Sequence, residues 1–172
     1  MECKEFLLSR RSIRYFQEKQ VPLETLLQAL DIARYAPSAK NLQPWEFIII
    51  TNREKLRELS KIHIGAKPLE RTNVAIVVLA DKHASPISYL IDGAIVATYL
   101  WLALHCIGLG AVWIQTLRNI EDIRNILSIP ENLIPIAILA IGYPAEKPVP
   151  KPRKDLRNLV HINTYGNKLE TT

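Results

Sequence analysis

The sequence has few cysteines and no long apolar run, and both absences limit what the protein can be. Cys3 and Cys106 lie far apart in segments with helical spacing, so they predict no disulfide framework and favour a reducing compartment, with Cys106 in the core. The longest apolar run, residues 94–104, is shorter than the ~20 residues that span a bilayer. The N-terminus carries charges where a signal peptide is apolar. We therefore expect a cytoplasmic protein without a membrane partner.

Metal-binding and nucleotide-binding motifs are also missing. The four histidines have no spacing that would place two of them on one helical face, which argues against a zinc site. The stretch Gly108-Leu109-Gly110 lacks the third glycine of the dinucleotide fingerprint, because that position is Trp113, and it follows a predicted helix instead of a strand. No Walker sequence occurs either. The sequence thus predicts no Rossmann unit, although NAD(P)H can still act as a transient electron donor.

The overall composition is ordinary for one globular domain. The chain has 172 residues, 48% hydrophobic and 23% charged, without repeats, low-complexity runs or a shift that marks a second domain. Its net charge of +5 favours an anionic partner. The basic residues gather in two clusters, 10–14 and 151–157, each too short for a nucleic-acid-binding tail. We expect no nucleic acid partner.

Hydrophobic periodicity and helix-breaking residues predict helices and strands mixed along a single domain, residues 1–172. The predicted helices cover 2–9, 22–35, a segment after Thr51, 89–107 and 119–127. Thr51 and Glu54 have the spacing of a capping box. The predicted strands cover 45–51, 74–80, 111–115 and 136–142, the last one preceded by Pro135. Residues 143–172 are rich in proline and are predicted to form an extended C-terminal arm.

The segment 89–107 is apolar on all sides of the predicted helix. Such a helix has to be buried all round. One domain of this size can bury a helix completely, but the same helix of a second subunit can cover it equally well. This pattern favours a homodimer.

Three arginines and a serine occur within five residues near the start of the chain, namely Arg10, Arg11, Ser12 and Arg14. Guanidinium groups present forked donors that match phosphate oxygens two at a time, and a serine hydroxyl adds another donor. The motif can therefore hold one phosphate group. The alternative is a solvated basic turn.

A second motif, residues 37–45, places polar side chains in a loop with proline at both ends. Prolines stiffen the loop, which lowers the ordering cost of binding. Amide side chains donate and accept, so they can recognise a heterocycle whose edge alternates carbonyl and N–H groups, as a flavin does. The alternative is a turn in which the side chains cap their own backbone.

Taken in order, residues 10–14, 37–45, 108–114 and 151–153 resemble the FMN-dependent nitroreductase family. The resemblance covers nearly the whole chain. It implies an α+β class with a nitroreductase-like fold, in which a mostly antiparallel central sheet is flanked by helices. It also implies an intertwined homodimer that holds two FMN molecules at the subunit interface.

The resemblance also implies which residues bind FMN. Those expected at the ribityl phosphate and the flavin edge are Arg10, Arg11, Ser12 and Arg14, joined from the arm by Lys151 and Arg153. Those expected to reach the flavin from the other subunit are Pro37, Ser38, Asn41 and Gln43, with Ala39 at a position where many relatives have serine. The main chain near Ile114 and Gln115 would pass close to the ring. Positive charge from Lys40 or Arg14 would stabilise the anionic reduced flavin.

Two departures from the family pattern concern the pocket. Gln115 stands where many relatives have glycine, which changes the pocket wall. The segments 61–74 and 81–92 are short for the family, which predicts an open substrate pocket.

The implied activity is a ping-pong oxidoreduction in which NAD(P)H delivers hydride to flavin N5 and a small acceptor, a quinone or nitroaromatic, then takes its place. No side chain has to act as acid or base, because the flavin performs the redox chemistry. Related flavin reactions, namely reductive dehalogenation and oxygen-dependent consumption of reduced flavin, remain open, since fold resemblance does not separate them. A non-catalytic basic module that binds nucleic acid or a protein is a further alternative, but it leaves the loop at 37–45 unexplained.

Overall fold

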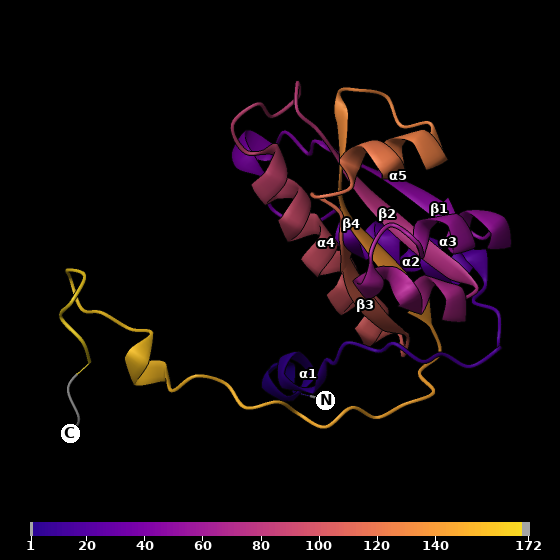
Figure 1. Ribbon diagram of the computed structural model, residues 1–172. Helices are drawn as coiled ribbons and strands as arrows, with labels where there is room; N and C mark the ends of the chain where they lie inside the picture. Colours follow the sequence, from indigo (N-terminus) through magenta and orange to yellow (C-terminus); the bar gives the residue numbers. More distant parts are fainter. Residues whose placement is uncertain (1, 170–172) are drawn as a thin grey trace.

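The computed structural model describes residues 2–169, and a four-stranded sheet lies between two layers of helices (Figure 1). The strands stand in the order β1 (Trp45–Ile50), β2 (Val74–Asp81), β4 (Leu133–Gly142) and β3 (Gly110–Gln115). Each neighbouring pair is antiparallel. The α+β class and the antiparallel central sheet are thereby confirmed.

Helices cover both faces of this sheet. α2 (Leu23–Ala33) and α4 (Tyr89–Cys106) pack on one face, against Ile76 and Val78 of β2. α3 (Arg53–Leu59), the 3-10 helix η2 (Ile64–Arg71) and α5 (Ile120–Leu127) pack on the other, against Ala75 and Val77. Successive strand residues point to opposite faces, so a strand covered on both sides is apolar throughout. This explains the continuous apolar runs of β2 and β4.

The single chain does not bury the helix at 89–107 on all sides, so the first of the two alternatives, complete burial within one domain, does not hold. Leu100 and Leu104 of α4 are fully buried, but Ile91 is 62% exposed and Tyr99 is 40% exposed. α4 is long and apolar enough to cross a membrane by length and composition alone. Buried core helices of other proteins meet the same two criteria, and 39% of α4 is buried. It packs on α2 and the sheet as a core helix does.

The cap of α3 also differs from the prediction. Asn52, not Thr51, caps the helix: its side-chain oxygen accepts hydrogen bonds from the backbone N–H groups of Glu54 and Lys55, at 2.9 and 3.0 Å. Both residue types are good caps, and the choice depends on which backbone turns into the helix first.

β4 begins earlier than predicted, at Leu133, so that Pro135 lies inside the strand instead of before it. The register between β2 and β4 shifts at Val78 and Leu79, directly beside Pro135. Proline has no N–H to donate to the ladder and is tolerated in a strand at such a bulge.

The remaining elements are short. α1 (Cys3–Ser9) has no buried residue, η1 covers Ala39–Asn41 within the proline-flanked loop, and η3 covers Leu156–Asn158. Cys106, expected in the core, is exposed, as is Cys3. After β4 the chain runs past α1 and away from the sheet (Figure 1).

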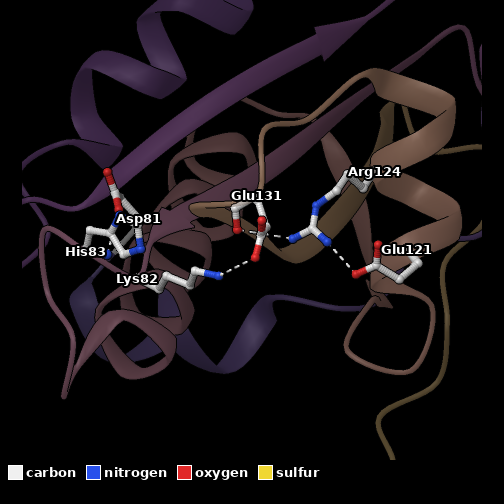
Figure 2. A network of polar contacts seen from close by, with 6 residues as sticks. All are labelled: Asp81, Lys82, His83, Glu121, Arg124 and Glu131. Carbon is white, nitrogen blue, oxygen red and sulfur yellow. Dashed lines mark hydrogen bonds and ion pairs between the residues drawn. The ribbon is translucent and has the colours of Figure 1, made fainter.

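A polar network joins the end of β2 to the start of β4 and to α5 (Figure 2). Lys82 Nζ lies 3.6 Å from Glu131 Oε1, and the Glu131 carbonyl accepts a hydrogen bond from Arg124 Nη2 at 3.4 Å. Arg124 also pairs with Glu121 within α5. Asp81 begins the same turn and accepts the backbone N–H of His83 at 2.7 Å. The network braces the end of the sheet that carries the proline-flanked loop, since the Asp81 N–H donates to the carbonyl of Pro44.

Candidate functional site

The arginine motif is tied to the edge strand β3. Ser12 forms a parallel bridge with Ala111, and the Ile13 N–H donates to the Ala111 carbonyl at 3.0 Å. Ile13 is buried directly against Gly110, where a Cβ would lie 2.7 Å from Ile13 Cγ1. Glycine at 110 is therefore needed for the motif to lie this close to the sheet.

The arm brings the second basic cluster to the first. Beyond β4, the Ala145 N–H donates to the Tyr15 carbonyl at 3.0 Å, and the Glu146 carboxylate accepts the backbone N–H groups of Arg14 and Tyr15. A cavity of about 520 Å³ results. Its lining includes all six residues expected at the phosphate: Arg10, Arg11, Ser12, Arg14, Lys151 and Arg153.

Arg10 lies at the centre of this positive charge. Burial lowers the pKa of its guanidinium, and the charges of Arg11 and Arg153 lower it further. Its Nη1 is buried and has no hydrogen-bond partner among the described residues. A buried cationic donor without an acceptor is costly unless an anion satisfies it, and a phosphate oxygen is such an anion. The cavity therefore fits a phosphate group.

The other arginines of the motif are engaged differently. Arg11 Nη1 donates to the carbonyls of Leu8 and Arg10, at 2.7 and 2.8 Å, and thereby caps the end of α1. Arg14 is exposed, and its Nη1 lies 3.5 Å from the Ser12 carbonyl, the limit of a hydrogen bond. Arg14 is thus the more available of the two for a ligand.

A second cavity, of about 500 Å³, adjoins the first and shares Arg10 with it. Its lining includes Trp101 and His105, one helical turn apart on α4, and the glycines that follow α4. The pKa of His105 is lowered, first by burial and then by the charge of Arg10, which favours the neutral imidazole. The sequence reasoning missed both residues, although their four-residue spacing places them on one face of α4.

The proline-flanked loop has a defined shape. The Ala39 N–H donates to Asp92 Oδ1 at 3.0 Å, and the buried Asp92 accepts the Ser85 hydroxyl through Oδ2 at 3.0 Å. Ser38 Oγ accepts the backbone N–H of Gln43 at 3.0 Å, as expected of a turn whose side chains cap their own backbone.

The loop backbone nevertheless departs from a simple turn. Lys40, Asn41 and Gln43 all have positive φ, between 48° and 58°. Non-glycine residues adopt this conformation at a cost, and such strain often occurs at binding sites. Pro37, Asn41 and Gln43 are exposed, and the Gln43 side-chain amide donates back to the Asn41 carbonyl at 3.3 Å.

Within one chain the loop and the arginines do not meet. The loop is bonded to Asp92 in the first turn of α4, whereas Ser9 beside the arginine motif is bonded to His105 in the last turn, at 2.7 Å. His105 follows Asp92 by thirteen positions along the helix, which is a rise of roughly 20 Å. The structure thus places the loop and the arginine motif at opposite ends of α4.

The two expected residues of β3 differ in exposure. The Ile114 side chain is buried, on the face of the sheet that carries α3 and α5, so only its backbone can touch a ligand. Gln115 is exposed, and its carbonyl lies 2.8 Å from His63 Nε2. His63 Nδ1 accepts the Gly65 N–H, so Nε2 carries the proton and donates to Gln115. No sequence pattern singles out His63. In the part of the chain that the structure describes, no three His, Cys, Asp or Glu side chains gather as metal ligands.

The chain is similar to nitroreductases along most of its length. The model of the nitroreductase family matches residues 7–85 and 65–143. A relative from Methanothermobacter thermautotrophicus, whose name combines NADH dehydrogenase and NAD(P)H nitroreductase, is 39% identical over 86% of this chain and 80% of the relative. The solved structure of an FMN-dependent nitroreductase from Clostridium difficile is 35% identical, with a TM-score of 0.84 over 94% of this chain and 99% of that one. An iodotyrosine deiodinase from Thermotoga neapolitana is 30% identical over 91% of this chain and 95% of the relative.

The protein therefore belongs to the nitroreductase family. This confirms the resemblance expected from the motifs.

Proposed function

We propose that this protein is an FMN-dependent oxidoreductase that takes electrons from NAD(P)H and passes them to a small acceptor such as a quinone or a nitroaromatic. The observation that carries this proposal is the convergence of residues 10–14 and 151–153 on one cavity, where Arg10 Nη1 lacks a partner. The names of relatives, which include an FMN-dependent nitroreductase and an NAD(P)H nitroreductase, support the same cofactor and donor.

The side chains of the cavity would bind and orient the cofactor. Arg10, Arg14, Lys151 and Arg153 would hold the phosphate of FMN, with Arg11 and Ser12 completing the lining. Bound FMN would supply the hydride chemistry, and no side chain is assigned as acid or base. Positive charge from Arg14, or from Lys40 of the loop, would favour the anionic form of the reduced cofactor.

The active unit is proposed to be a homodimer. A two-fold axis would bring the loop of one protomer, with Pro37, Ser38, Ala39, Asn41 and Gln43, to the arginines of the other. Exposed apolar side chains on the outer faces of α2 and α4 support this, namely Leu23, Leu27, Ile91 and Tyr99. The chain would then be a single domain with residues from 143 onward as an arm toward the partner. A solution mass of twice 19.6 kDa is expected, and a stable monomer that retains FMN would contradict the shared site.

Two further parts of the prediction belong to this proposal. The main chain at Ile114 and Gln115 would pass beside the flavin, with His63 holding the Gln115 carbonyl. The two free cysteines, both exposed, suit a reducing compartment, and we propose the cytoplasm.

The first experiment is an absorbance spectrum after loading with FMN and removal of the excess. We expect flavin bands at about one FMN per chain and bleaching by NAD(P)H. Arg10→Ala should weaken FMN binding about 100-fold, because a charge-assisted contact is lost. Arg57→Ala, which removes an exposed arginine of α3, is the matched control and should bind FMN as the parent does. A colourless protein would overturn the proposal and leave the basic binding module.

Steady-state kinetics test the order of the two half-reactions. The donor and the acceptor are expected to use the same face of the flavin in turn, so double-reciprocal plots should give parallel lines. Intersecting lines would contradict a ping-pong mechanism.

Reductive dehalogenation is the second candidate, favoured by the 30% identity to an iodotyrosine deiodinase over almost the full length of both chains. Iodide release from iodotyrosine under reducing conditions would support it. Oxygen-dependent consumption of reduced flavin is the third, and reduced flavin that persists in air would exclude it.

A further inference from the structure

Trp101 is fixed in place by the strand that also holds the arginine motif. Its indole Nε1–H donates to the Ala111 carbonyl at 3.1 Å. The same carbonyl accepts the Ile13 N–H at 3.0 Å. One backbone oxygen of β3 therefore sets both the orientation of the Trp101 ring and the course of the chain that follows Arg10.

The Arg10 guanidinium lies over this ring. Its Cζ is 4.1 Å from the centroid of the Trp101 indole. A cation–π contact with the ring uses none of the guanidinium's hydrogen-bond donors, and Nη1 has no partner among the described residues. The stack thus holds the charge in place while leaving a donor for an anion.

The helix before Arg10 is held more loosely than the chain after it. α1, which leads into Arg10, has no buried residue. It is held to the last turn of α4 by the ring of Phe6, 5.2 Å from that of His105, and by the contact of Ser9 with His105. The contacts that precede Arg10 thus run to the last turn of α4, those that follow it run to β3, and Trp101 lies against the guanidinium itself.

We infer that Trp101 is a positioning residue that holds Arg10 for the phosphate of the cofactor. This rests on the proposed function. A long arginine side chain loses conformational freedom when it binds, and a stack that immobilises it beforehand removes part of that cost. Trp101 would therefore act on the phosphate through Arg10 and have no effect on the ring system of the flavin.

The test compares FMN with riboflavin, which has the same ring and no phosphate. Dissociation constants are measured by fluorescence for the full chain and for Trp101→Leu. We expect Trp101→Leu to weaken FMN binding about tenfold and to leave riboflavin binding within about twofold. Trp101→Phe keeps an aromatic face and should retain most of the FMN affinity. In an Arg10→Ala background, Trp101→Leu should add no further loss, since its effect passes through Arg10.

Controls separate this inference from general damage. Tyr143→Leu removes another cation–π contact, in which Lys19 Nζ lies 4.2 Å from the Tyr143 ring. It should leave the ratio of the FMN and riboflavin affinities unchanged. Trp101→Met has a longer and more flexible side chain that adapts to irregular gaps, and it serves if Trp101→Leu does not fold.

The possible outcomes distinguish the role of Trp101 from the proposed function. Equal losses for FMN and riboflavin, or no loss for either, would overturn the positioning role of Trp101. Failure of the parent protein to bind either flavin would instead overturn the proposed function.

Discussion

The two ends of α4 differ in how far their polar groups are satisfied by hydrogen bonds. At its C-terminal end, around Trp101, cationic side chains gather and Arg10 Nη1 has no partner among the described residues. At its N-terminal end, Asp92 accepts hydrogen bonds from Ala39 and Ser85, and the loop is closed by its own contacts. One end supplies unsatisfied charge, which favours an anion. The other supplies a backbone shape that exists before any ligand binds. Within one chain, the charge that favours an anion and the loop with a preformed backbone shape thus lie at opposite ends of α4.

The largest effect is expected at the N-terminal end. Asp92→Ala leaves the part-buried Ala39 N–H and the buried Ser85 hydroxyl without their acceptor, so it should lower the free energy of unfolding by about 3 kcal/mol. Urea unfolding measures this. Ser85→Ala removes one of the two bonds and should cost about 1 kcal/mol. A cost for Asp92→Ala as small as that of Ser85→Ala would mean that the carboxylate does not hold the loop.

The next effect is expected at the arginine end. Gly110→Ala would place a Cβ 2.7 Å from Ile13 Cγ1 and push the arginine motif off β3, at a cost of about 2 kcal/mol. Gly108→Ala is the control. Its φ is +83°, but a Cβ added there would have no neighbouring side chain or backbone atom within 4 Å, so the variant should cost only about 1 kcal/mol of backbone strain. Thermal unfolding compares them. The comparison fails if Gly108→Ala is the more destabilising.

A smaller effect tests the internal closure of the loop. Ser38→Ala removes the hydroxyl that accepts the Gln43 N–H and should cost about 1 kcal/mol in the protein without cofactor. Ser88→Ala, at a helix start where the side chain makes no capping bond, should cost less. Chemical unfolding of both variants gives the difference, and equal costs would show that the loop does not need its own hydrogen bond.

The smallest effect is a pH dependence at the network beside the loop. The His83 N–H, with lesser help from Ala84 and Asn132, holds the pKa of Asp81 below its ordinary value of 3.8. The folded state therefore favours the charged carboxylate. Its contribution is present above the ordinary pKa and is lost as the pH falls through the lowered one. The stability difference between the parent and Asp81→Asn should shrink as the pH falls from above the ordinary value of 3.8 to below it. A difference that grows on acidification would contradict the sign.

Local patterns predicted most of the fold, because helices and strands follow from the spacing of apolar residues. The strands and the main helices lie where periodicity placed them, to within a few residues. The errors arose where neighbouring residues compete or where a partner strand decides. Thr51 and Asn52 are both good helix caps, and Pro135 is accepted inside β4 only because β2 shifts its register opposite to it. Cys106 is apolar enough for a core, yet it lies on the outer side of α4.

The sequence by itself determined the chemistry of the candidate site, because charge and hydrogen-bonding capacity belong to the side chains. The arginines of residues 10–14 can hold a phosphate by their chemistry alone, whereas the part of residues 151–153 is predicted only from the family resemblance. Only the tertiary structure decided that they share one cavity, since β4 must pair in the sheet before the arm can return past the arginine motif. It also decided that Arg10 lies on Trp101, and that α4 separates the loop from the arginines. Distances between segments remote in sequence depend on long-range pairing, which no local pattern encodes.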